Sequence, residues 1–545
     1  MTGEPGTRGF DPLAVEVHQH LFAAVAEEMG VALQRSAFSA NIKERLDFSC
    51  AVFGSGGELV AQAAHLPVHL GATPLSVEAV LSAHALRPGD VAFQNDPFGG
   101  GTHLPDITAV APVFDPEAPD ARRPSFHVVS RAHHADVGGA FPGSMAPARD
   151  VHGEGLRLPP VRIVREGRVD EDLLALFLAN VRVPGERRAD LFAQIAAAKV
   201  GVERLQELCR GAGARHLEAR GRDLVRWTAE VTRRRLAELP TGTWRFTDHV
   251  EGGPDGRGAP LPIELEIQSR GGRLVFDFRG AADQATDGAP VNTTRAVTVS
   301  AVFYGLRLLL PAGTPTNAGV MEHVEVLTRP GSLCDAAYPA PVAAGNVETS
   351  QRLTDVVLGA LARILPGELP AASAGTMSNL SFGGTRPGGA AFTHYETHGG
   401  GAGAGPRRAG AHALQTHMTN TRNTPVEALE AELPVRVLHQ TIRRGSGGAG
   451  ARQGGDGLTR RLRFETDVRL SWMSERTSSG PYGLAGGAAG TPSEALVRPA
   501  GALAAGPVDP KATLDLTAGS EFELRTPGGG GHGAVEESKR SASGD

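Results

Sequence analysis

Histidine residues are concentrated in one stretch of the sequence, where they recur close to aspartate. Residues 65–152 contain eight of the 19 histidines in the chain. One group in this stretch, residues 95–106, reads Asn-Asp-Pro-Phe-Gly-Gly-Gly-Thr-His-Leu-Pro-Asp. Its three glycines allow a tight loop, and Pro105 stiffens the backbone between His103 and Asp106. Such a loop can direct an imidazole and a carboxylate toward one point.

A second group, Arg-Ala-His-His-Ala-Asp at residues 131–136, directly follows an apolar run at 126–129. If a strand continues through this group, His133 and His134 point to opposite faces, and Asp136 shares the face of His134. Only one of the two histidines then joins His103 and Asp106, and the other becomes a hydrogen-bond partner. Two imidazoles and a carboxylate suit a zinc, manganese or iron ion with open positions for water or substrate. A polar loop without metal is the alternative, and spacing alone leaves both open.

Other chemistries lack their motifs or are disfavoured. The sequence contains neither a GxxxxGK[ST] phosphate loop nor a GxSxG nucleophile motif. His65 and His69 have helical i, i+4 spacing, but Pro67 lies between them, which favours a loop over a shared metal. The three cysteines cannot form a disulfide framework. Cys50 lies in an apolar run, so we expect a buried core thiol there.

The composition excludes several classes of partner. The chain has 545 residues, a formal net charge of −6 and only 5% aromatic residues. We therefore expect binding neither to nucleic acid nor to a membrane. The N-terminus lacks the pattern of a signal peptide, and the longest apolar stretch, 296–310, is too short to cross a bilayer. These features predict a cytoplasmic protein.

The apolar periodicity predicts an α+β fold. Asp11 and Pro12 are suited to begin a helix over 11–29, in which apolar residues recur every fourth position (Leu13, Val17, Leu21 and Val25). Gly271-Gly272 joins two alternating runs, which predicts a hairpin. Short apolar runs between about 41 and 164 indicate strands and loops. Further helices are expected near 191–205, 224–231, 296–310 and 348–365.

Glycine and proline account for 71 and 38 residues, but 41% of the chain is hydrophobic, which excludes a disordered or collagen-like chain. We expect one large mixed body over 10–533, with metal-bearing loops in its N-terminal part and several glycine-rich loops. The glycine-rich segments are 398–405, 445–457 and 528–533. The expected parts are a metal-site part (about 10–180), a helical segment (about 186–240), a mixed remainder (about 241–533), and disordered ends (1–9 and 534–545).

Motifs along nearly the whole chain resemble the hydantoinase B/oxoprolinase family. The matching segments occur in order, so together they are far more specific than any one of them. They are Asn-Ile-Lys-Glu-Arg-Leu-Asp (41–47), His-Leu-Pro-Val-His-Leu-Gly (65–71), the two histidine groups above, Asn-Val-Arg-Val-Pro-Gly-Glu-Arg-Arg (180–188), Ala-Gly-Asn-Val-Glu-Thr-Ser (344–350), Thr-Asn-Thr-Arg-Asn-Thr-Pro (419–425) and Thr-Pro-Gly-Gly-Gly-Gly (526–531).

The resemblance implies the B subunit of an ATP-dependent hydrolase of cyclic amides, either hydantoin or 5-oxoproline. A partner A subunit would bind ATP and phosphorylate the amide, and this chain would cleave the C–N bond at a divalent metal. The resemblance implies that Asp47, His103, Asp106 and His133 hold that metal, with His133 favoured over His134 after allowing for an insertion near 116–124. His134 or Asp136 would orient a ligand or move protons. Glu396 is a further candidate for substrate contact.

Two other functions remain open at this stage. The chain could be a subunit of an acetone- or acetophenone-type carboxylase, or a catalytically silent scaffold for the A subunit. The substrate, the metal and the stoichiometry of the expected hetero-oligomer cannot be read from the sequence.

Overall fold

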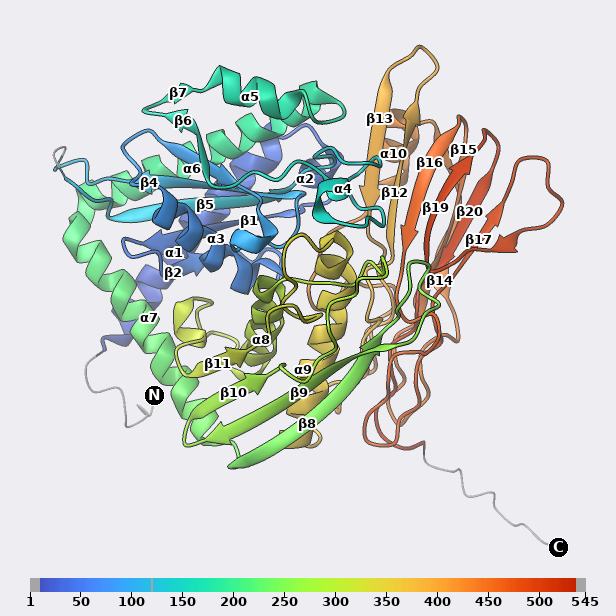
Figure 1. Cartoon of the computed structure of the whole chain (residues 1–545). Coiled ribbons are helices and arrows are strands. Elements are labelled where there is room, and N and C mark those ends of the chain that lie inside the picture. Colours follow the sequence, from blue (N-terminus) through green and yellow to red (C-terminus); the bar gives the residue numbers. More distant parts are fainter. Residues whose placement is uncertain (1–9, 119–120, 536–545) are drawn as a thin grey trace, which may run out of the picture.

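Four β-sheets and the helices that cover them are formed by residues 10–118 and 121–535, which the computed structural model describes (Figure 1). The mixed α+β class predicted from the sequence is confirmed. The ends expected to be disordered fall largely on residues 1–9 and 536–545, and these lie outside the described residues, as do 119–120 within the expected insertion. Among the described residues, no helix has the length and apolar character needed to cross a membrane.

The largest sheet, here called the central sheet, has seven strands in N-terminal segments and carries the histidine motifs. Neighbouring strands pair antiparallel throughout. Their order is β2 (Leu59–Gln62), β1 (Phe48–Gly54), β5 (Phe126–His133), β4 (Asp106–Val113), β3 (Val91–Gln94), β6 (Val161–Arg165) and β7 (Arg168–Val169).

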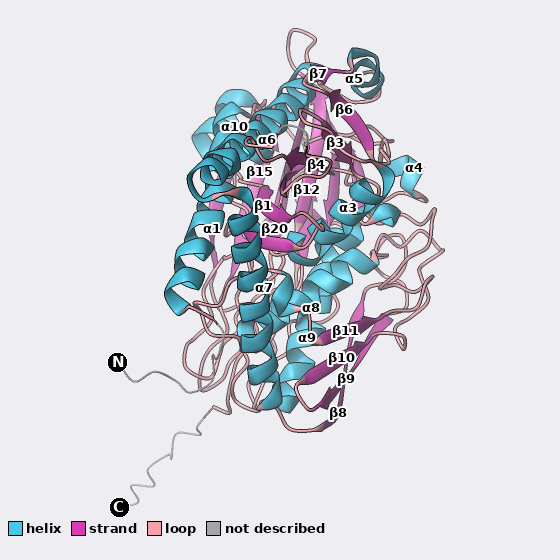
Figure 2. Ribbon diagram, turned by 90° about the vertical axis from the view of Figure 1, so that its left-hand side faces the viewer, coloured by secondary structure: helices cyan, strands magenta, loops and turns pink. Residues whose placement is uncertain are grey.

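Helices cover both faces of the central sheet. On one face lie α1 and α6, and on the other lies α3, which also packs against α8. Beyond α8 come α9 and a four-stranded sheet, while α7 runs from the central sheet toward that second sheet (Figure 2). The helices are α1 (Pro12–Ser36), α2 (Ala40–Lys43), α3 (His69–Ala83), α4 (Val151–Glu154), α5 (Glu171–Leu178), α6 (Pro184–Ala212), α7 (Ala214–Ala237), α8 (Arg295–Leu309), α9 (Ser350–Ile364) and α10 (Val426–Glu432).

The predicted N-terminal helix forms, with Asp11 as its cap. The Asp11 carboxylate accepts a hydrogen bond from the Leu13 backbone N–H at 3.1 Å. The helix extends seven residues beyond the expected end, and its buried stripe differs from the apolar repeat read from the sequence. Leu13 and Val17 are 69% and 46% exposed, whereas Phe22 and Met29 are fully buried. The difference arises because α6 packs closely on α1, with Gly201 against Met29.

The predicted hairpin is also confirmed. Arg270 and Arg273 pair across the Gly271-Gly272 turn, and both glycines have positive φ, as a tight turn between strands requires. This hairpin belongs to the second sheet, whose strand order is β11 (Val324–Leu327), β10 (Arg273–Asp277), β9 (Leu261–Arg270) and β8 (Gly242–Val250).

Two further sheets in the C-terminal third pack through a common apolar cluster. Phe382 meets Phe464, with ring centroids 5.2 Å apart, and Trp472 meets Phe522 at 5.7 Å. One sheet has the order β13 (Ala391–Glu396), β12 (Asn379–Thr385), β16 (Val468–Met473) and β19 (Lys511–Leu516). The other has the order β14 (Val435–Arg443), β15 (Gly457–Phe464), β20 (Glu521–Arg525), β17 (Glu494–Arg498) and β18 (Gly506–Pro507).

The glycine-rich segments gather into one structure, here called the glycine bundle (residues 399–405, 445–457, 480–490 and 528–533). Its chains exchange main-chain hydrogen bonds: the Gly529 N–H donates to Gly455 O at 2.9 Å and the Gly448 N–H donates to Gly529 O at 2.8 Å. The chains are so close that a Cβ on Gly529 would lie 2.1 Å from the carbonyl oxygen of Ala402. As at the crowded axis of collagen, only glycine fits there. The sequence pointed to three of these segments but not to 480–490.

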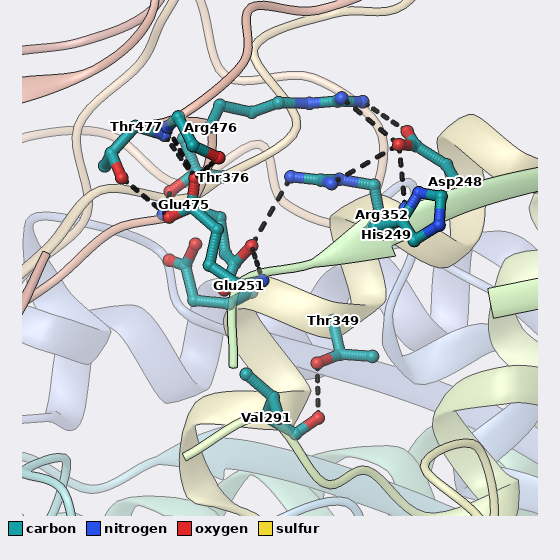
Figure 3. Close-up of polar contacts among 12 residues, drawn as sticks. Asp248, His249, Glu251, Val291, Thr349, Arg352, Thr376, Glu475, Arg476 and Thr477 are labelled. Carbon is teal, nitrogen blue, oxygen red and sulfur yellow. Dashed lines mark hydrogen bonds and ion pairs between the residues drawn. The ribbon is translucent and has the colours of Figure 1, made fainter. Parts of the chain in front are cut away.

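A network of buried ion pairs joins β8, α9 and the segment after β16 (Figure 3). Arg476 pairs with Asp248 at 2.7 Å and with Asp355 at 2.9 Å, and Glu475 pairs with Lys511 at 2.9 Å. Burial alone would lower the pKa of Arg476, but the charges of Asp248 and Asp355 hold this pKa above its usual value, and the guanidinium stays charged. The network ties the C-terminal sheets to the second sheet.

Candidate metal centre

Three adjacent strands of the central sheet bring acidic and imidazole side chains into one row. Asp106 on β4 pairs in register with His133 on β5. On the other side of β5, the His133 N–H donates to the carbonyl of Asp47, immediately before β1, at 3.0 Å. Side chains alternate across a sheet, so these three positions share the face that α3 covers. The register therefore explains why Asp47 and Asp106, 59 positions apart in sequence, both lie beside His133.

The glycine loop before β4 and the first residue of α3 complete the site. Gly100 has a φ of 89°, and a Cβ there would lie 2.5 Å from the Leu75 carbonyl oxygen, so the loop packs tightly on α3. His103 follows this loop. His69 begins α3, and its Nε2 lies 3.2 Å from Asp106 Oδ2.

The donor atoms of His103, Asp106 and His133 converge to within 4.8 Å of one another. Nδ1 of His103 lies 3.3 Å from Asp106 Oδ2, and Nδ1 of His133 lies 3.5 Å from Asp106 Oδ1. Nε2 of His103 and Nδ1 of His133 are 3.3 Å apart. All three side chains are buried. Asp47 is buried beside them, but its carboxylate does not belong to this converging group.

The charges at the site favour metal-binding protonation states. Burial alone would raise the pKa of Asp106, but the charges of His103 and His69 and hydrogen bonds from His103 and His133 hold this pKa well below its usual range. Burial lowers the pKa of His133, against the opposing charges of Asp47 and Asp106. An ionised carboxylate and a neutral imidazole are the forms that bind a metal.

The residues fit a divalent transition metal. Two imidazoles and one carboxylate are ligands for zinc, manganese and iron. Nε2 of His133 is buried and has no hydrogen-bond partner among the described residues, whereas a buried polar atom is normally paired. Hydrogen bonds also orient the carboxylate, since the Thr102 hydroxyl donates to Asp106 Oδ2 at 2.7 Å. The donor set is thus both correct in type and supported by its surroundings.

His134 and Asp136, the predicted catalytic residues, lie apart from this group. His134 Nε2 lies 2.9 Å from Gln194 Oε1 of α6, on the opposite face of the sheet from His133. Burial lowers the pKa of His134 to about 4, so this ring is neutral. β5 ends at His133, and the Asp136 carboxylate accepts hydrogen bonds from the Gly138 and Gly143 N–H groups and pairs with Arg182 at 3.1 Å.

Tyr395 of β13 forms a wall of the site that sequence patterns did not reveal. Its ring is stacked on the ring of His133, with centroids 4.8 Å apart and an angle of 9° between the planes. Arg45 donates to the Tyr395 carbonyl at 2.9 Å and lies over the ring, 5.1 Å from its centroid. The contact brings the C-terminal part of the chain onto the candidate metal ligands. In the sequence, Arg45 belongs to the same motif as Asp47. That motif gives no indication that β13 lies beside it.

Three other residues singled out in the sequence have clear positions. Nδ1 of His65 accepts a hydrogen bond from the Cys50 N–H at 3.0 Å, whereas His69 faces Asp106. Cys50 is fully buried, as predicted. Glu396 is buried and bound to Arg460 at 2.6 Å.

Known proteins resemble this chain over nearly its whole length. The sequence pattern of the hydantoinase B/oxoprolinase family matches residues 11–535. 5-oxoprolinase 1 of Arabidopsis thaliana is 37% identical over 96% of this chain, although the chain covers only 42% of that longer protein. A protein of Pseudomonas sp., provisionally named as the B subunit of a D-/L-hydantoinase, is 28% identical over 87% of this chain and 81% of its own length.

The structure also resembles that of an enzyme of known fold. The ATP-dependent caprolactamase from Pseudomonas jessenii superimposes with a TM-score of 0.87 at 25% identity, over 96% of this chain and 92% of that chain. Sequence, fold and converging histidines therefore agree, and the chain belongs to the hydantoinase B/oxoprolinase family.

Proposed function

We propose that this chain is the hydrolytic B subunit of an ATP-dependent enzyme that opens cyclic amides of the hydantoin or 5-oxoproline type. The observation that carries the proposal is the convergence of His103, Asp106 and His133 at one buried point. The relatives named above act, by their names, on 5-oxoproline, hydantoin or caprolactam, which share a ring amide.

In this proposal Asp47, His103, Asp106 and His133 hold a zinc, manganese or iron ion. When bound, the ion supplies a Lewis acid that polarises the amide and lowers the pKa of a water molecule. The protein contributes the geometry: Asp106 stays ionised beside His103 and His133, and Tyr395 keeps water from one side of the His133 ring. Asp47 is included because its backbone carbonyl bonds to the His133 N–H at 3.0 Å, which places it next to the converging group.

We assign His134 and Asp136 to orientation of the site. His134 fixes the end of β5 against α6 through Gln194, and Gln194 also donates to the Ile107 carbonyl on β4 at 2.9 Å. Asp136 secures the turn that follows. Both therefore act on the strand ends that present Asp106 and His133.

The ATP site is assigned to a partner A subunit. The sequence has no GxxxxGK[ST] loop, and the Pseudomonas sp. relative is named as one subunit of its enzyme. The longer 5-oxoprolinase, of which this chain covers 42%, has room for both functions in one chain. We therefore expect a hetero-oligomer here, in which activation and cleavage take place on different subunits.

The test is reconstitution with the A subunit and a panel of hydantoins, 5-oxoproline, lactams and ketones. Ring opening coupled to ATP hydrolysis is expected, and neither subunit alone should be active. Bicarbonate incorporation into a ketone without lactam cleavage would establish the carboxylase instead. Full turnover after replacing His103 and Asp106 with alanine would establish the silent scaffold.

A further inference from the structure

Glu348 is a buried acid with no assigned role. It lies in a single π-helical turn, Gly345–Thr349, that leads into α9, and such turns often mark functional sites. Its Oε1 accepts hydrogen bonds from the Met377 N–H at 3.3 Å and from Nδ2 of Asn379. Its Oε2 is buried and has no hydrogen-bond partner among the described residues.

A chain of contacts leads from this carboxyl to the candidate metal centre. Asn379 donates to Glu348 with one end of its amide and accepts from the Tyr395 hydroxyl with the other, at 2.7 Å. The Tyr395 ring is in turn stacked on His133. Because the amide can satisfy both neighbours in only one orientation, the acceptor on Glu348 decides where the tyrosine hydroxyl is held.

The surroundings of Glu348 keep its carboxyl uncharged. Burial and the nearby charge of Glu475 raise its pKa to about 8, although the Thr376 hydroxyl, Lys511 and the Met377 N–H act in the opposite direction. Lys511 is already paired, at 2.9 Å, with Glu475. A neutral acid has the shape and hydrogen-bonding groups of a glutamine, so the two side chains should be interchangeable here.

We propose that Glu348 is a positioning residue of the metal centre: it holds Asn379, Asn379 holds the Tyr395 hydroxyl, and Tyr395 holds the His133 ring in its metal-binding plane. The proposal rests on the function proposed above, because it requires that His133 bind a metal. It goes further in assigning a remote residue, on a different element and in a different part of the fold, to the affinity of that site.

A zinc titration of the purified full-length chain with a competing chelator tests this proposal. Glu348→Ala and Tyr395→Leu should each weaken zinc binding about 10- to 100-fold, the range typical for groups that orient metal ligands. Glu348→Gln should bind within about threefold of the wild type, because it retains the acceptor for Asn379. The double variant Glu348→Ala/Tyr395→Leu should be little weaker than either single one, since both break the same chain.

Glu154 offers a matched control. It too is a buried acid whose Oε2 has no hydrogen-bond partner within the described part of the chain. Its Oε1 accepts a hydrogen bond from the Ala343 N–H at 2.9 Å rather than from Asn379. Glu154→Ala should lower the urea midpoint as Glu348→Ala does while leaving zinc affinity unchanged. Comparing the two alanine variants shows whether a loss of zinc affinity comes from the lost bond to Asn379 or from general destabilisation.

The outcomes distinguish the two proposals. If the wild type binds zinc and His103→Ala does not, the metal centre stands. Unchanged zinc affinity in Glu348→Ala, or a loss in Glu348→Gln as large as in the alanine variant, then overturns the role of Glu348 alone. If the wild type binds no divalent metal, both the proposed metal centre and the proposed role of Glu348 are refuted.

Discussion

His133 and His134 are neighbours in the chain, but their side chains lie on opposite faces of the central sheet. The His133 ring faces Asp106 and His103, and the His134 ring faces Gln194 of α6. This alternation distinguishes two residues that the sequence motif presents as equivalent.

His133→Ala should therefore abolish metal binding, whereas His134→Ala should retain the metal. Loss of a direct ligand is expected to exceed the roughly 10- to 100-fold loss of affinity seen when an outer partner is removed. Elemental analysis of the purified variants measures this directly. His439→Ala, a substitution of an exposed histidine on β14, is the control for metal lost during purification. A metal-free His134→Ala beside a metal-loaded His133→Ala would reverse the assignment.

The buried ion network should contribute strongly to stability. Arg476→Met removes a buried guanidinium that pairs with both Asp248 and the fully buried Asp355, and breaking a buried pair typically costs about 3–5 kcal/mol. The free energy of unfolding in urea measures the effect. Arg469→Met removes an exposed pair with Asp515 and should cost about 0–1 kcal/mol. Equal losses in the two variants would contradict the importance of burial.

Glu154 should make the protein less stable as the pH rises through neutrality. Burial raises its pKa from 4.5 to about 7. Below pH 4.5 the carboxyl is neutral in both the folded and the unfolded chain. Between pH 4.5 and 7 the unfolded chain releases its proton first, so folding stability falls, and above pH 7 the loss is complete. This rise of the pKa from 4.5 to about 7 corresponds to roughly 3 kcal/mol.

Glu154→Gln removes this loss and keeps the acceptor for the Ala343 N–H. Unfolding curves at pH 4.5 and pH 8 should show a smaller decrease for the variant than for the wild type. Glu203→Gln, an exposed substitution on α6, should leave the decrease unchanged. A wild-type decrease that persists in full in Glu154→Gln would be evidence against a neutral buried carboxyl at this position.

Gly529→Ala should destabilise the glycine bundle. The added Cβ would lie 2.1 Å from the Ala402 carbonyl oxygen, and because a main-chain atom cannot move aside like a side chain, the cost should be about 3 kcal/mol, the upper end of the usual range for overpacking. Thermal unfolding provides the measurement. Gly506→Ala is the matched control, because a Cβ there meets no atom within 4 Å. Similar midpoints for the two variants would refute the tight packing.

The sequence predicted part of the candidate site and for an identifiable reason. The spacing of His103 and Asp106 and the alternation at His133 are local, so they could be read from the order of residues. The contribution of Tyr395 depends on how β13 meets the central sheet, and that contact spans 262 positions (133 to 395). Nothing local in the sequence encodes such a distance.

The fold, like the site, could be predicted from the sequence only where the pattern is local. The helices α1, α6, α7, α8 and α9 and the β9–β10 hairpin have strong local patterns and were predicted, whereas α3 lies in a region where strands and loops were expected and was not. The strands of the two C-terminal sheets were not predicted, and their pairing joins segments far apart in the chain, as β12 pairs with β16. The existence of α1 could be predicted from its own sequence, but which of its sides is buried depends on the packing of α6 against it.

The glycine bundle has a consequence for how this part of the chain exchanges its amide hydrogens. Its residues lie largely outside helices and strands, yet their N–H groups donate to carbonyls of neighbouring segments. Amides of Gly455, Gly529 and Gly530 should therefore exchange with deuterium as slowly as those of a sheet, although a circular dichroism spectrum would count them as coil. The four segments are spread over more than 100 residues, and each depends on the others for its hydrogen bonds. The protection of all four should therefore be gained and lost in one cooperative step.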